Sequence, residues 1–139
     1  MTQEEKELLA KDLCSRLPYN CMVSIAEGGI EGIKWADVTL NYYLLYQIME
    51  EDAWEYVKPY LRPLSSMTES EKEELKTLCD EDLSEFAGHL MKGHGLSRDG
   101  LYMFDKLRQL DWLNKHHFDF RGLIPKGLAL KAKDGMYNK

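Results

Sequence analysis

The chain has 139 residues and a formal net charge of −6, from 24 acidic and 18 basic residues. Hydrophobic residues make up 44% and charged residues 30%, which is typical of a folded protein and excludes a largely disordered one. The length predicts one domain over residues 1–139. The longest apolar run, residues 42–46, is far shorter than the roughly 20 residues of a membrane span. The start is acidic and polar, unlike a signal peptide, so we expect a cytoplasmic protein with no membrane partner.

An amphipathic helix is predicted over residues 2–17. Thr2 and Glu5 have the spacing of a capping box, in which each side chain binds the other residue's backbone amide. The apolar face is predicted to consist of leucines at four-residue intervals, Leu9, Leu13 and Leu17. The solvent-facing side is predicted to carry the charged residues Lys6, Glu7, Lys11, Asp12 and Arg16. Pro18 ends the helix.

A small antiparallel sheet is predicted between about residues 20 and 49. Residues 22–26 form its first strand, two glycines at 28–29 allow the chain to reverse, and residues 30–35 return. The even positions from Val38 to Ile48 are all apolar, which is the alternation of a strand. A second interpretation stays open for residues 41–49. In it, Asn41 caps a helix that buries one set of side chains, Tyr42, Leu45, Tyr46 and Met49.

Residues 50–67 are predicted to form a joint between the sheet and the helices that follow. Pro59 and Pro63 hold the residues before them extended, so no helix is expected across residues 58–64. The joint is expected to attach to the body of the fold through apolar side chains, Tyr60, Leu61 and Leu64.

The C-terminal half is predicted to be mainly helical. A second capping box, Thr68 with Glu71, begins a helix whose apolar residues continue at steps of three or four. This pattern predicts one long helix, or two joined near residues 80–82, ending at Lys92 with Gly93 as the C-cap. Residues 94–96 are the expected loop.

A third helix is predicted from a cap at Ser97 or Asp99 to Lys115. One side carries a regular apolar row, Met103, Leu107, Leu110 and Leu113. The nearly opposite side carries two further apolar residues, Leu101 and Trp112. This helix is expected to be central in the core or to present its second face to a partner.

The remaining residues are predicted to form a docked segment. Residues 118–127 are rich in turns, residues 128–130 suit a short strand, and the last residues are expected to be a polar tail. The predicted fold is α+β, with an N-terminal helix, a small antiparallel sheet, a helical C-terminal half and a docked tail.

Cysteine and histidine offer little support for a metal or redox site. The three cysteines, Cys14, Cys21 and Cys79, are expected to be reduced, with Cys14 and Cys79 buried beside leucines. A zinc site built from Cys79, His89, His94 and His116 would match no usual ligand spacing. His116 and His117 are instead expected to end a helix and satisfy its last carbonyls. We therefore expect no metal and no cofactor.

No catalytic motif is present in the sequence. It contains no HExxH, P-loop, GxGxxG or GxSxG pattern. His117 with Asp119 would suit an oriented base, but no nucleophile accompanies them. We predict no catalytic residue.

Charge is unevenly distributed along the chain. Residues 50–85 contain 12 acidic and four basic residues, whereas residues 115–139 contain six basic and two acidic ones. The acidic stretch is suited to a basic partner surface. The basic end, with Phe118, Phe120 and Tyr137 nearby, is suited to nucleic acid.

Two passages carry a resemblance to a known family. They are KPYLRPLSSMTE at residues 58–69, continued by EKEE at 71–74, and WLNKHHFDFRGLIPKGLAL at residues 112–130. Together with residues 4–9 and 17–19, they resemble a family of small uncharacterised proteins of gut anaerobes and their phages and mobile elements. The resemblance implies a cytoplasmic protein of prophage or mobile-element origin, and it implies no activity, cofactor or catalytic residue. Both passages contain proline or glycine, and we expect them to pack together as a structural clasp.

The leading hypothesis is a non-enzymatic protein-interaction or accessory factor. Its candidate interaction patch draws on both passages and consists of Tyr60, Arg62, His116, His117, Asp119, Arg121 and Lys126. The alternative is a nucleic-acid-binding accessory protein that uses the basic residues of the C-terminal segment, Arg121, Lys126, Lys131 and Lys133.

Overall fold

The computed structural model describes residues 1–29, 32–80 and 98–137. They belong to two compact units, which are described separately. The first unit comprises Met1–Leu64 and Asn114–Lys139, and the second comprises Ser65–Leu113. Helices and a four-stranded sheet make the fold α+β, as predicted. The single-domain organisation stays a prediction.

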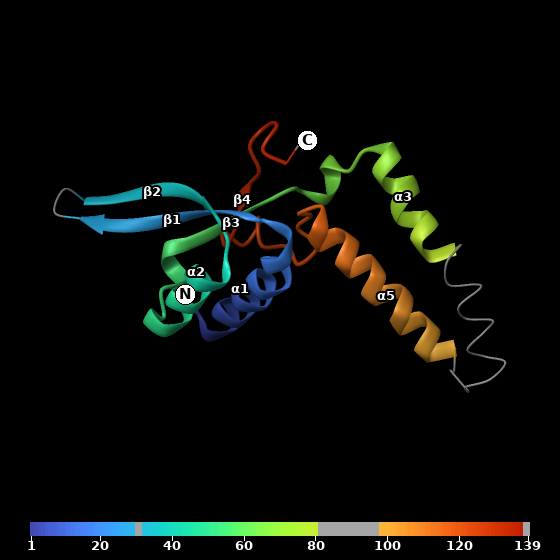
Figure 1. The fold of residues 1–139 in the computed structure, drawn as a ribbon, viewed down its shortest axis with the longest axis horizontal. Coiled ribbons are helices and arrows are strands. Elements are labelled where there is room, and N and C mark those ends of the chain that lie inside the picture. Colours follow the sequence, from blue (N-terminus) through green and yellow to red (C-terminus); the bar gives the residue numbers. More distant parts are fainter. Residues whose placement is uncertain (30–31, 81–97, 138–139) are drawn as a thin grey trace. The chain divides into compact units, whose positions relative to one another are not determined.

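A mixed four-stranded sheet organises the first unit (Figure 1). Its strands are β1 (Met22–Gly29), β2 (Gly32–Thr39), β3 (Val57–Leu61) and β4 (Leu130–Lys131), in the order β2-β1-β3-β4. β1 pairs antiparallel with β2, which confirms the predicted hairpin, but Gly28 and Gly29, expected at its turn, pair with Ile33 and Gly32 inside the ladder. β1 also pairs antiparallel with β3, and β3 pairs parallel with β4, so the sheet is not purely antiparallel as predicted. β3 lies within the predicted joint, so the extended backbone around Pro59 belongs to the sheet.

The N-terminal helix α1 (Gln3–Arg16) forms as predicted. The Thr2 hydroxyl accepts a hydrogen bond from the Glu5 amide at 3.1 Å, and the Glu5 carboxylate accepts one from the Thr2 amide at 3.1 Å. Its buried face, however, is Leu9, Asp12, Leu13 and Arg16. The prediction that Asp12 and Arg16 face solvent is therefore wrong. They share the i, i+3, i+4, i+7 stripe with the two leucines, and this stripe packs into the core.

The predicted strand over residues 41–49 is wrong, because this segment is helix α2 (Tyr42–Glu51). The Asn41 side chain caps it by accepting a hydrogen bond from the Leu44 amide at 2.8 Å. The helical alternative is correct in its cap but not in its buried face. Leu45 and Ile48 are buried, whereas three of the residues expected inside are exposed, Tyr42, Tyr46 and Met49. The four-residue step from Leu44 to Ile48 fits both the two-residue period of a strand and the 3.6-residue period of a helix. The apolar even positions therefore did not distinguish a strand from a helix here.

The core of the first unit joins α1, α2, the sheet and the C-terminal segment. It includes Leu9 and Leu13 of α1, Leu45 and Ile48 of α2, and Val23, Val57 and Leu61 of the sheet, with Leu123, Leu128 and Ala129 from the C-terminal segment. Tyr60 and Leu61 are buried as the sequence predicts. Leu64, expected to anchor the joint, is instead exposed.

The second unit contains α3 (Glu69–Asp80) and most of α5 (Arg98–Lys115), whose last two residues belong to the first unit. The capping box at Thr68 forms, since the Thr68 and Glu71 side chains each accept the other residue's amide. Trp112 is buried and its indole nitrogen donates to the Glu74 carboxylate at 3.2 Å. Leu107 is exposed, so its row on α5 is not uniformly buried as a central helix would require.

Several predictions fall outside the described residues. They concern the continuation of α3 to Lys92, the Gly93 cap, the loop at residues 94–96 and the Ser97 cap. The side chains of Leu101 and Met103 are likewise not described.

Candidate functional site

The two passages that carry the family resemblance contact each other in the first unit. The Arg62 amide donates to the His117 carbonyl at 2.7 Å, and the Asp119 amide donates to the Arg62 carbonyl at 2.8 Å. Tyr60 and Leu130 are partners in the parallel pairing of β3 with β4. The Arg62 guanidinium also lies 4.2 Å from the centre of the Phe118 ring. These contacts confirm the expected clasp, a term used below for residues 58–63 and 116–131.

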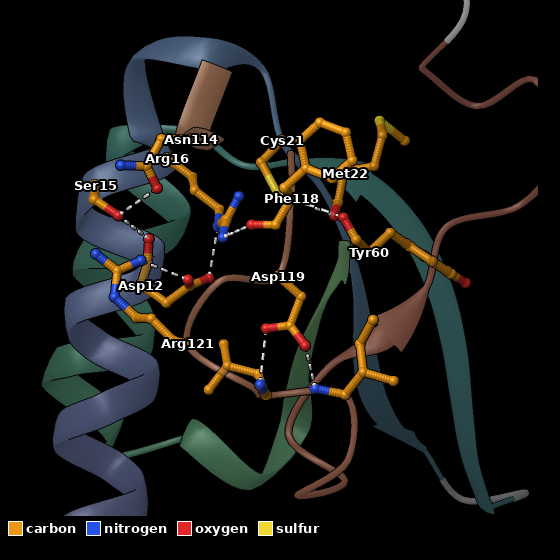
Figure 2. A network of polar contacts seen from close by, with 12 residues as sticks. Asp12, Ser15, Arg16, Cys21, Met22, Tyr60, Asn114, Phe118, Asp119 and Arg121 are labelled. Carbon is orange, nitrogen blue, oxygen red and sulfur yellow. Dashed lines mark hydrogen bonds and ion pairs between the residues drawn. The ribbon is translucent and has the colours of Figure 1, made fainter. Parts of the chain in front are cut away.

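A buried ion network fastens α1 to the clasp (Figure 2). Asp12 and Arg16 have no exposed side-chain surface, and Arg16 Nε donates to Asp12 Oδ2 at 2.8 Å. Arg121 Nη1 donates to Asp12 Oδ1, the second oxygen of the same carboxylate, at 2.7 Å. Arg16 Nη2 donates to the Phe118 carbonyl at 2.6 Å. Both Asp12 oxygens are thus occupied by arginine, which makes this carboxylate a structural anchor and no free base.

Asp119 shapes the turn that follows it. Its two carboxylate oxygens accept the backbone amides of Leu123 at 2.8 Å and Ile124 at 2.9 Å. Within the described ranges, Asp119 and His117 form no hydrogen bond with each other. The arrangement of an oriented base, weighed from the sequence, is therefore not formed. Figure 2 shows the Asp119 carboxylate directed at the turn backbone.

His117 is a buried, neutral side chain. Its backbone has a positive φ of 65°, and its amide donates to the Asn114 carbonyl at 3.1 Å. Burial lowers the pKa of His117 to about 4, with further lowering from the positive charges of Arg16, His116 and Arg62. α5 ends at Lys115, directly before His116 and His117, as predicted. At His117, however, the backbone amide and not the imidazole donates to the Asn114 carbonyl.

This burial predicts a pH dependence of stability. The pKa of His117 is about 4 when folded and near 6.5 when unfolded, so the unfolded chain binds more protons between these values. Its contribution is therefore fully present above pH 6.5 and falls as the pH drops toward 4, by about 3 kcal/mol in total. We expect urea unfolding at pH 7 and pH 4.5 to show this loss, and His117→Gln to reduce it. An equal loss in both proteins would contradict the assignment.

Tyr137 anchors the C-terminus, so the prediction of a polar tail is wrong at this residue. Its hydroxyl accepts from the Met22 amide at 2.9 Å and donates to the Tyr60 carbonyl at 2.7 Å. Its ring stacks on His117 with the ring centres 3.7 Å apart and the planes at 14°. The last described residue is therefore held by both β1 and β3.

The cysteines differ from expectation. Cys14 is exposed where burial was predicted, and the side chain of Cys79 is not described. Cys21 is buried, and burial raises the pKa of its thiol to about 11. The Cys21 thiol is thus protonated at neutral pH and is a poor nucleophile.

An open pocket of about 430 Å³ lies beside the clasp, entirely within the first unit. It is lined by Pro18, Tyr19, Asn20, Arg62, Lys115, His116, His117, Met136 and Tyr137. Three residues of the predicted interaction patch therefore meet in one hollow, Arg62, His116 and His117.

The other residues of that patch have different settings. Tyr60 and Asp119 are buried, Arg121 is half-buried in its ion pair with Asp12, and Lys126 is exposed. The buried Tyr60 side chain donates its hydroxyl to Asp37 of β2 at 2.8 Å, whereas the buried Asp119 carboxylate holds the turn within the clasp.

Helix α2 carries an exposed aromatic stripe that was not predicted from the sequence. It consists of Tyr42, Tyr43, Tyr46 and Met49, whose exposed fractions are 74%, 69%, 52% and 55%. These residues lie at i, i+1, i+4 and i+7, on the side opposite Leu44, Leu45 and Ile48. The position of the three aliphatic residues on one helix face was the signal that this side, and not the tyrosines, is buried.

The structure offers no metal cluster within the ranges it describes, where no three His, Cys, Asp or Glu residues are grouped to hold an ion. Of the possible zinc set, His89 and His94 lie outside those ranges. No helix among the described residues has both the length and the hydropathy needed to cross a bilayer. No protein-family model, curated protein or solved structure matches the chain.

Proposed function

We propose that this protein is a non-enzymatic interaction factor that binds another protein through the aromatic stripe of α2. The observation that carries the proposal is the exposure of four large side chains on one helix face, each more than half accessible to solvent. The family resemblance of the clasp passages adds the proposal of a prophage or mobile-element origin and a cytoplasmic location.

The composition of the stripe supports protein binding. Tyrosine and methionine are enriched at protein interfaces, where an aromatic ring supplies a large contact area and loses little rotamer entropy. The opposite face of α2 anchors the helix in the core through Leu45 and Ile48. The stripe is therefore presented on a rigid element, which lowers the entropic cost of binding.

Features beside the stripe indicate the chemistry of the partner. The stripe itself offers an apolar and aromatic surface, whereas an open pocket of about 200 Å³ lined in part by Leu44 and Ile48 lies on the other side of α2 and is not part of it. Glu50 and Glu51 are exposed at the end of the helix. We therefore propose a partner with an apolar centre and basic residues at its rim.

The nucleic-acid alternative has weaker support than protein binding, because two of its four basic residues are already in ion pairs. Arg121 is paired with buried Asp12, and Lys133 Nζ lies 2.6 Å from Asp37 Oδ2. Only Lys126 and Lys131 of this set are exposed without a described ion pair. Salt-dependent binding of a duplex or single strand, weakened by Lys126→Glu and Lys131→Glu, would favour this alternative instead.

The double substitution Tyr42→Ala/Tyr46→Ala tests the proposed function. Because interface aromatic residues each contribute about 2 kcal/mol or more when central, we expect partner retention to fall at least about tenfold. The folded state should be unchanged, since both side chains are exposed. The control is Trp35→Ala, which removes an aromatic residue of β2 that is 48% exposed and lies outside the stripe. Equal losses in the double variant and the control would contradict a site on α2.

A further inference from the structure

We propose that the pocket beside the clasp binds a phosphomonoester, either on a free small molecule or at the 5′ end of a nucleic acid strand. The site is distinct from the aromatic stripe: its residues come from the end of α5, the clasp, the turn after α1 and the C-terminal segment. The inference therefore stands independently of the proposed function.

The charge of the pocket favours an anion. Arg62, Lys115 and His116 are among its lining residues, and the described lining contains no Asp or Glu. The charged groups that act on His117 are also basic, namely Arg16, Arg62 and His116. Guanidinium and ammonium groups bind phosphate well, the first through paired N–H donors and the second as a point charge. A phosphomonoester, with up to two negative charges, matches this set better than a singly charged carboxylate.

A buried histidine in the pocket wall supports a polar ligand. His117 is 8% exposed, yet its Nδ1 has no hydrogen-bond partner among the described residues. An unpaired buried nitrogen has a free-energy cost, so such atoms are rare outside functional sites. Stacking on Tyr137 fixes the ring in place. A phosphate oxygen in the pocket is the kind of acceptor that a protonated Nδ1 lacks among the described residues.

The size and walls of the pocket suit an organic group attached to the phosphate. A volume of about 430 Å³ lies within the range of small-molecule sites. Pro18, Tyr19 and Met136 supply apolar and aromatic surface to the same lining. The pocket can thus hold a phosphate at its basic side and a ring or sugar against these walls.

Adenosine monophosphate is the first probe, with adenosine as the uncharged comparison. Calorimetric titration of the full chain is expected to give saturable binding of the monophosphate with a Kd below about 1 mM, and none of adenosine. Lys115→Glu should weaken binding at least about tenfold, because it reverses a charge at the pocket. The matched control Lys126→Glu reverses an exposed charge outside the lining and should change Kd less than about twofold. The His117 imidazole signals should shift on binding in the wild-type NMR spectrum.

Three results would overturn the proposal: no saturable binding of the monophosphate, equal binding of adenosine, or equal weakening by Lys115→Glu and Lys126→Glu. A short oligonucleotide with and without a 5′-phosphate separates the two sources. Tighter binding of the phosphorylated strand than of the monophosphate assigns the site to a strand end, and the reverse order assigns it to a free phosphomonoester. Both of these orders support a phosphomonoester site.

Discussion

Asp12→Ala is expected to lower the free energy of unfolding by about 3–5 kcal/mol, because it leaves the fully buried Arg16 without its carboxylate. Arg121 of the clasp loses the same partner, so the substitution removes one ion pair within α1 and one between α1 and the clasp. Urea denaturation followed by circular dichroism measures the change. The cost arises from an uncompensated buried charge and not from lost apolar area, since aspartate contributes little of the latter.

Glu7→Ala is the matched control for this experiment. Glu7 is an acidic residue on the same helix, but it is exposed and accepts only a long hydrogen bond of 3.4 Å from Gln3. Its removal should change stability by less than about 0.5 kcal/mol. Similar effects of the two substitutions would show that the buried ion network does not hold α1 to the clasp.

Tyr137→Ala is expected to cost about 3–5 kcal/mol, as large aromatic truncations at packed sites do. The substitution removes both the stack on His117 and the hydroxyl that bonds Met22 and Tyr60. Tyr137→Phe keeps the ring and should cost only about 1–3 kcal/mol, from the unpaired Met22 amide and Tyr60 carbonyl. Thermal and urea unfolding of both variants separates the contribution of the ring from that of the hydroxyl.

A loss of less than about 0.5 kcal/mol in Tyr137→Ala would show that the C-terminal segment is not docked in solution. Met136→Ala provides a nearby comparison, because Met136 lines the pocket and is only half-buried. We expect Met136→Ala to be the milder of the two alanine substitutions.

Local signals predicted the helix starts well. The capping boxes at Thr2 and Thr68 depend on side chains three residues apart, so no distant part of the chain decides them. The same holds for the Asn41 cap, on which the helical interpretation of residues 41–49 depends. Its hydrogen bond to Leu44 shows that a cap residue at the start of an ambiguous apolar run favours a helix.

The burial of charge could not be read from residue type alone. Asp12 and Arg16 were placed on the solvent side because such residues are rarely buried. Their partners, Arg121 and the Phe118 carbonyl, lie more than 100 residues further along the chain, where the clasp supplies them. The face shared with Leu9 and Leu13 was nevertheless visible in the sequence spacing.

The candidate site was predicted in part. Contact between the two motif passages was expected and is formed, and it brings Arg62, His116 and His117 to one pocket. The docking of Tyr137 onto β1 and β3 was not predictable, because its partners are backbone groups that carry no sequence signal. The tyrosines of α2 were expected inside as β-formers or core residues, whereas the burial of Leu45 and Ile48 turns them outward.

Partner capture is the most direct test of the central claim that the aromatic stripe binds a protein. Immobilised wild-type, Tyr42→Ala/Tyr46→Ala and Trp35→Ala proteins are compared by quantitative mass spectrometry of retained host proteins. We predict a reproducible partner that the wild type and Trp35→Ala retain equally and the double variant retains at least about tenfold less. Identical retained sets for the wild type and the double variant, or no reproducible partner at all, would contradict the claim.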